Sequence, residues 1–167
     1  RVYNAFEFGN DLHKKELIDD NSFYSDDTIL TIAILDAVLN NKPYGDKLKE
    51  YGLKYKEEIP ENIDYFEYMF SPGFIRWCES NEVGKSIGNG SAMRVSPVGF
   101  YATTFGEAME LAKRSAEVTH NHHEGIKGAQ AVACAIFLAR AGKNKEEIKK
   151  ELEYWFNYDL NRKIDDI

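Results

Sequence analysis

The sequence predicts an all-α fold, a compact multi-helix bundle that forms a single domain over residues 1–167. Apolar residues recur along the chain with the spacing of amphipathic helices, and no segment shows the strict alternation that is typical of a half-buried strand. A chain of 167 residues with 43% hydrophobic and 13% aromatic residues is also long and apolar enough to form one core.

The most apolar run of the chain, from Ile29 to Leu39, predicts a central helix because apolar residues occupy almost all of its faces. Ser25 or Asp26 can cap the start of this helix. Its end is expected at Asn40-Asn41, just before Pro43.

Two shorter helices are expected next, followed by a glycine-rich loop from Val83 to Ser91. The first of them stops before Pro60, and its apolar stripe consists of Leu48, Tyr51 and Tyr55. The second begins at Ser71-Pro72, since proline is favoured at the first helical position, and its core residues are Phe74, Ile75 and Trp77.

Three helices are predicted in the second half of the chain. A capping box at Thr104-Phe105-Gly106-Glu107 starts a helix that ends near Thr119-His120. A long apolar helix then follows His123 and is closed by Gly142 as a C-cap. The charged segment from Lys145 to Phe156 predicts an amphipathic helix with Ile148, Leu152 and Trp155 on its inward side.

Composition excludes several classes of protein. A net charge of −7 gives no basic face for nucleic acid, and no apolar run reaches the roughly 20 residues of a membrane span. Cys78 and Cys134 lie far apart among apolar neighbours, as buried free thiols do, so we expect a reducing, cytoplasmic location. The first residues are too polar for a signal peptide and include no initiating Met, which is consistent with a fragment of a longer chain.

The adjacent carboxylates of Asp26 and Asp27 stand at the start of the most apolar segment. One acid at a helix start satisfies free N–H groups and complements the helix dipole, and most such acids have no further role. A second carboxylate adds repulsion unless a cation neutralises the pair. Oxygens fixed at a helix end suit hard cations such as Mg²⁺ or Ca²⁺, and Thr28 could add a hydroxyl ligand.

The glycine-rich loop and the histidine cluster each allow two interpretations. Gly84-Lys85-Ser86 is not a P-loop, because Glu79 stands where the motif needs its first glycine; the loop is either a plain turn or a backbone anion cradle. The cluster His120-Asn121-His122-His123-Glu124 lacks a zinc ligand set, since Lys127 stands where HExxH needs its second histidine. We expect one imidazole to line a pocket and the others to be solvated.

Four ordered motifs together resemble the ADP-ribosylglycohydrolase family over nearly the whole chain. They are Ser25-Asp26-Asp27-Thr28; Ser71-Pro72-Gly73-Phe74 before Trp77; Gly88-Asn89-Gly90-Ser91-Ala92-Met93-Arg94 leading to Pro97-Val98-Gly99; and Ser115 to His120 followed by Gly125, Gly128, Ala129 and Ala131.

This resemblance implies a compact all-helical hydrolase that uses two Mg²⁺ ions to cleave the glycosidic bond of ADP-ribosyl groups. Its substrate would be an ADP-ribosylated protein or a small ADP-ribose derivative, and ADP-ribose would be released. The implied metal ligands are Ser25, Asp26 and Asp27. The implied substrate-binding residues are Gly88, Asn89, Gly90, Ser91 and His120, and the implied catalytic residues are Glu7, Asp26 and Asp27.

The sequence departs from the family pattern at both ends. The N-terminal Gly-Asp helix has no counterpart, nor does the C-terminal Asp-x-Asp-Ser/Thr metal motif, because Asp165-Asp166-Ile167 lacks the Ser or Thr. The second Mg²⁺ site is therefore expected to be incomplete. Two alternatives stay open: an inactive module that binds ADP-ribose or a nucleotide, and a truncated helical interaction protein with an exposed apolar patch.

Overall fold

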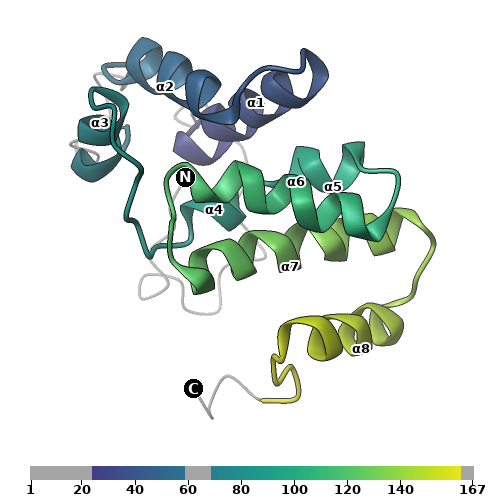
Figure 1. Ribbon diagram of the computed structural model, residues 1–167. Coiled ribbons are helices and arrows are strands. Elements are labelled where there is room, and N and C mark those ends of the chain that lie inside the picture. The colour runs from purple at the N-terminus through teal and green to yellow at the C-terminus, as the bar shows by residue number, and fades with distance from the viewer. Residues whose placement is uncertain (1–23, 59–68, 163–167) are drawn as a thin grey trace, which may run out of the picture.

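The computed structural model describes residues 24–58 and 69–162, and this part of the chain consists of helices without a β-strand (Figure 1). The predicted all-α class is thereby confirmed. No helix of the described part is long and apolar enough to cross a bilayer. The helices are α1 (Asp26–Leu39), α2 (Tyr44–Tyr55), α3 (Pro72–Cys78), α4 (Gly90–Met93), α5 (Ser96–Tyr101), α6 (Phe105–Glu117), α7 (His123–Arg140) and α8 (Lys145–Phe156).

The long helix α7 is the centre of the packing. It contacts α4, α5 and α6 on one side and α8 on the other, while α2 and α3 pack together beyond α1 (Figure 1). Small buried residues on α7 permit these close approaches: Gly125, Ala129, Ala131 and Ala133. The main core lies between α1 and the layer formed by α5, α6 and α7.

Helix α1 has the predicted bounds, but the prediction that it is central was wrong. Ile32 and Leu35 are exposed by 46% and 41%, and Leu39 by 65%. The described neighbours α2, α4 and α5 cover only the side formed by Ile29, Leu30, Ala33, Ile34, Ala37 and Val38. Among the described residues, α1 therefore lies at the edge rather than at the centre of the packing.

Helix α5 was missed by the sequence analysis. It is short and contains Pro97 and Gly99, which lower any helix prediction. Pro97 is tolerated because it lies in the first turn. Gly99 is required by packing, since a Cβ there would lie 2.6 Å from the backbone oxygen of Ala133 on α7. Arg140 of α7 closes the contact by donating to the oxygens of Gly99 and Ala102 at 3.0 and 3.1 Å.

The helix ends largely follow the predicted chemistry. Thr104 caps α6 by accepting from the Glu107 amide at 3.1 Å. The Glu107 carboxylate accepts from the amide and hydroxyl of Thr103 and not from the Thr104 amide, so only half of the predicted capping box forms. Gly142 has φ +82° and ends α7, as predicted. The prediction for α8 was wrong at Trp155, which is 51% exposed, while Phe156 is buried.

Candidate functional site

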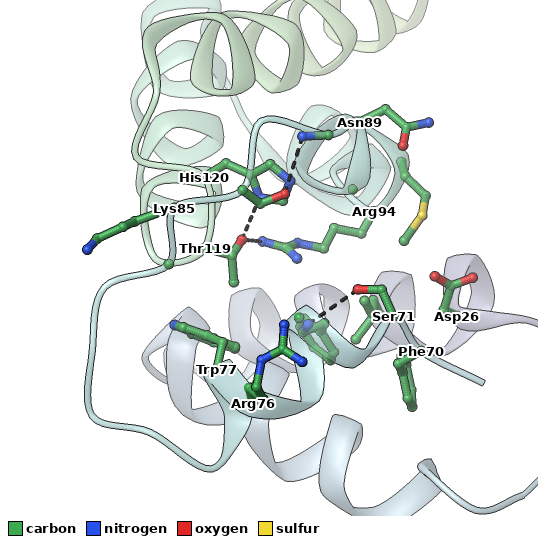
Figure 2. A pocket seen from close by; sticks show the side chains of 18 residues that line it. Asp26, Phe70, Ser71, Arg76, Trp77, Lys85, Asn89, Arg94, Thr119 and His120 are labelled. Atoms are coloured by element: carbon green, nitrogen blue, oxygen red, sulfur yellow. Dashed lines mark hydrogen bonds between the residues drawn. The ribbon is translucent and has the colours of Figure 1, made fainter. Parts of the chain in front are cut away.

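A cavity of about 570 Å³ opens between two walls of the described fold (Figure 2). One wall is built from the start of α1 and from α3. The other consists of the glycine-rich loop, α4 and the segment that follows α6. The lining residues are Asp26, Leu30, Phe70, Ser71, Gly73, Phe74, Arg76, Trp77, Gly84, Lys85, Ser86, Gly88, Asn89, Gly90, Met93, Arg94, Thr119 and His120.

The carboxylate pair is divided between the cavity and the outer surface. Asp26 lines the cavity, whereas Asp27 is exposed and does not line it. The Ser25 hydroxyl donates to Asp27 Oδ2 at 3.0 Å, and it makes no side-chain cap on α1. Burial, and then the neighbouring charge of Asp27, raise the pKa of Asp26. The Asp27 amide donates to Asp26 Oδ1 at 3.1 Å, which opposes part of this rise.

These oxygens fit a hard cation in kind but supply only part of its coordination shell. Carboxylate and hydroxyl oxygens are the ligands that Mg²⁺ prefers, and a cation would relieve the desolvation and repulsion at Asp26. Within residues 24–58 and 69–162, however, no cluster of three or more His, Cys, Asp or Glu side chains could hold a metal ion. Glu7, the third residue implied as catalytic, lies outside the described residues.

The glycine-rich loop is joined to the end of α6 by backbone hydrogen bonds. The Gly84 amide donates to the oxygen of Val118 and the Ser86 amide to that of Thr119, both at 3.0 Å, and Lys85 forms an isolated antiparallel bridge with His120. This pairing places His120 beside the loop. No β-strand had been predicted there, and a single bridge leaves too little alternating pattern to detect.

The residues expected to cradle a diphosphate have different environments. Gly88, Asn89 and Gly90 line the cavity, and Gly90 is the first residue of the one-turn helix α4. Ser91 is buried and does not line the cavity. Its hydroxyl donates to the Gly125 oxygen at 2.7 Å, so it anchors α4 to the start of α7.

His120 is the histidine of the cluster that lines the cavity. It is only 4% exposed, and a Cβ on Gly90 would lie 3.4 Å from its Cε1 atom while one on Gly125 would lie 3.0 Å from its Cβ. Burial and the positive charge of Arg94 lower the pKa of His120 to about 4. The imidazole is therefore neutral at physiological pH. His122 and His123 are exposed, as predicted for solvated side chains.

The sequence analysis assigned no role to Arg94, although it lines the cavity and is 1% exposed. Its Nη2 donates to Thr119 Oγ1 at 2.6 Å and to the Ser115 oxygen at 3.2 Å, while Nε has no partner among the described residues. Burial lowers the pKa of Arg94 to about 10, which still leaves it charged at neutral pH. The sequence held one signal for this residue: a cationic side chain between two apolar neighbours, Met93 and Val95, is expected to have a partner or a role if it is buried.

Three aromatic residues in contact lie in the opposite wall, namely Phe70, Phe74 and Trp77. The ring centroids of Phe70 and Phe74 are 5.3 Å apart, and those of Phe74 and Trp77 are 5.6 Å apart. Ser71 orders this segment by accepting from the Phe74 amide at 3.3 Å. The Trp77 Nε1 atom is buried without a partner among the described residues. The sequence analysis had placed Phe74 and Trp77 only in the core and made no prediction for Phe70, because core and cavity aromatics share one helical pattern.

Comparisons with known proteins show the family of this chain. The family model described as ADP-ribosylglycohydrolase matches residues 5–167. The chain is similar to the ADP-ribosylhydrolase ARH3 of Gallus gallus, with 30% identity over 135 residues, which is 74% of this chain and 37% of that protein. The corresponding Homo sapiens protein is 26% identical over 136 residues, covering 75% of this chain and 38% of that protein. The chain thus spans less than half the length of these relatives, and it belongs to the ADP-ribosylglycohydrolase family.

Proposed function

We propose that this chain acts in the hydrolysis of ADP-ribosyl groups attached to proteins or other acceptors, with release of ADP-ribose. One observation carries the proposal. Asp26, the Gly88–Gly90 segment and His120, which come from three distant parts of the sequence, line the same cavity of about 570 Å³. That volume is within the range of about 300–1,000 Å³ that is usual for small-molecule sites.

The distribution of charge and aromatic surface supports an ADP-ribosyl ligand. Three cationic side chains line the cavity, namely Arg76, Lys85 and Arg94, and Asp26 is the acidic side chain among its lining residues. Such an excess of cations favours a diphosphate. Phe74, which is half-buried at the cavity, offers a flat apolar surface on which a purine can stack, with the buried rings of Phe70 and Trp77 packed beside it.

The proposed roles of the individual groups follow from their positions. The backbone of Gly88 and Gly90 lets a phosphate approach closely, because no side chain intervenes. Ser25, Asp26 and Asp27 would hold Mg²⁺, with Asp26 on the cavity side. When bound, Mg²⁺ would orient ribose hydroxyls and a water molecule and lower the pKa of that water. Asp26 then presents its carboxylate to the ribose end of the ligand.

A turnover assay tests this proposal. ADP-ribosylated protein is incubated with the chain and Mg²⁺, and free ADP-ribose is measured. Asp26→Asn is expected to lower the rate by at least about 100-fold, the usual scale for a group that acts in the chemical step. Asp46→Asn is the matched control, since Asp46 also lies in the first turn of a helix but is exposed and does not line the cavity. Equal rates for the two variants would contradict the proposal.

The alternative of a non-catalytic ADP-ribose-binding module is favoured by one observation. In the described part of the chain, the carboxylate pair of Asp26 and Asp27 is not joined by a third acidic, His or Cys ligand. A divalent cation needs several oxygen ligands. Under this alternative, ADP-ribose binds in the same cavity without turnover, and Asp26→Asn leaves its affinity unchanged.

A further inference from the structure

Three buried side chains that line the cavity are joined in a series by hydrogen bonds (Figure 2). Arg94 donates from Nη2 to Thr119 Oγ1 at 2.6 Å, and Thr119 Oγ1 lies 2.7 Å from His120 Nδ1. All three residues line the cavity, and each is at most 4% exposed. Solvent is therefore largely excluded from the hydrogen bonds between them.

The direction of the hydrogen bond between Thr119 and His120 depends on where the Thr119 hydroxyl proton lies. A guanidinium has donors only, so Thr119 Oγ1 must accept from Arg94 and has one proton left to donate. Two acceptors are within reach: the Ala116 oxygen at 3.4 Å and His120 Nδ1 at 2.7 Å. Hydroxyl hydrogen bonds are normally about 2.5–3.0 Å long, which favours Nδ1. The Thr119 hydroxyl also accepts from the Arg94 cation, and this strengthens the hydrogen bond that the hydroxyl donates.

We propose that Arg94 and Thr119 are positioning residues that hold His120 as the neutral tautomer with its proton on Nε2. With Nδ1 accepting from Thr119, the one proton of a neutral imidazole must be on the other nitrogen. Burial next to the Arg94 cation opposes a second proton, in agreement with the lowered pKa of His120.

This tautomer gives His120 a defined task at the cavity. Nε2 has no hydrogen-bond partner among the described residues, and it lies under Gly90, where an added Cβ would be 3.6 Å away. A buried donor without an acceptor is costly, so an oxygen of a ligand seated at Gly90 would be bound in part by satisfying it. Because Nε2 is buried, the Gly88–Gly90 segment must also move aside when the ligand binds. This last step rests on the proposed function and assigns the Nε2 proton to an oxygen of the ADP-ribosyl group.

The tautomer can be measured directly in the ligand-free protein. A long-range ¹H–¹⁵N correlation spectrum at about pH 7 distinguishes protonated from unprotonated ring nitrogens. The His120 signals are those that disappear in His120→Gln. The proposal expects a proton on Nε2 and none on Nδ1. A protonated Nδ1, in either the other neutral tautomer or an imidazolium, would overturn it. This result does not depend on whether ADP-ribose binds.

A pair of variants then tests the role of Thr119. Thr119→Val keeps the shape of the side chain but removes the hydroxyl, so His120 is expected to lose its tautomer preference. Thr119→Ser keeps the hydroxyl and should restore the wild-type spectrum. The dissociation constant for ADP-ribose is expected to rise about tenfold in Thr119→Val and to recover in Thr119→Ser. Thermal midpoints for both variants show whether each is folded.

Two outcomes separate this inference from the proposed function. If wild type shows the Nε2 proton but does not bind ADP-ribose, the proposed function fails and the positioning of His120 stands. If Thr119→Val is folded and changes the tautomer but binds ADP-ribose as tightly as wild type, the assigned task of His120 is refuted.

Discussion

Gly84 lies directly against the backbone of Thr119: a Cβ on Gly84 would stand 2.4 Å from both the Cα and the carbonyl oxygen of Thr119. Both are main-chain atoms that cannot move aside independently. The contact brings the glycine-rich loop to the residue next to His120, and the Gly84 amide maintains it by donating to the Val118 oxygen at 3.0 Å. The geometry of one wall of the cavity therefore depends on the absence of a side chain at position 84.

Gly84→Ala is expected to separate the loop from the end of α6. The loss of stability should be about 1–3 kcal/mol, as for other overpacked sites, and ADP-ribose affinity should fall because Lys85 and His120 no longer pair. Urea unfolding and calorimetric titration check the two effects. Gly106→Ala is the control: no atom lies within 4 Å of a Cβ there, so stability should be unchanged or slightly raised. If Gly84→Ala left the free energy of unfolding unchanged, that result would contradict the structure.

Gly99→Ala is expected to destabilise the fold without altering the cavity. Its Cβ would lie 2.6 Å from the Ala133 oxygen and 2.7 Å from Ile136 Cβ, so α5 must move away from α7. A cost of about 1–3 kcal/mol follows. Neither Gly99 nor Ala133 lines the cavity, so the folded fraction should bind ADP-ribose with nearly wild-type affinity. A large loss of affinity in the folded variant would show that the α5–α7 contact also shapes the site.

The lowered pKa of His120 predicts how stability changes with pH. In the folded chain His120 titrates at about 4, against its usual 6.5, so between these values the unfolded chain binds the extra proton. The free energy of unfolding should therefore rise with pH across this window, by about 1.4 kcal/mol per pH unit from this group at most. The contribution of the neutral His120 to stability is fully present above the pKa of this group in the unfolded chain, and it is lost as the pH falls towards 4.

Urea unfolding of wild type and His120→Gln at several pH values isolates this contribution. The variant should show a shallower slope in the same window, since the other titrating groups are shared. Parallel curves for the two proteins would contradict a neutral, buried His120.

Ligand binding should change the fluorescence of Trp77 but not that of Trp155. Of the two tryptophans of the chain, Trp77 lines the cavity, whereas Trp155 lies on α8 outside it. In Trp155→Phe, which leaves Trp77 as the fluorophore, ADP-ribose should change the emission. In Trp77→Phe the emission should not change. The reverse pattern would place the ligand elsewhere.

Much of the fold was predictable because periodicity and caps are local signals. Thr104, Asn40 and Gly142 end or start helices through their own backbone and side-chain chemistry, and the structure places them as predicted. Helix α5 was not predictable in this way. Its Pro97 and Gly99 are acceptable only because of a tertiary contact with α7, which no local pattern contains.

The candidate site was predictable where a residue type was out of place in its surroundings. Asp26 before an apolar run and the glycines of the loop gave such signals, and the structure brings them to one cavity. Thr119 gave none, because a threonine near a helix end is ordinary. Its importance arises from its hydrogen bonds with Arg94 and His120, which require the folded geometry. Glu7 stays a prediction, since it lies outside the described residues.

The most direct test of the account is calorimetric titration of this chain with ADP-ribose, first with Mg²⁺ and then with a chelator. The account predicts one binding site per chain in the presence of Mg²⁺ and an affinity at least about tenfold weaker after chelation, because the Asp26 and Asp27 charges are then uncompensated. Absence of binding under both conditions would contradict the assignment of the cavity. Binding of equal strength under both would contradict a metal role for Asp26.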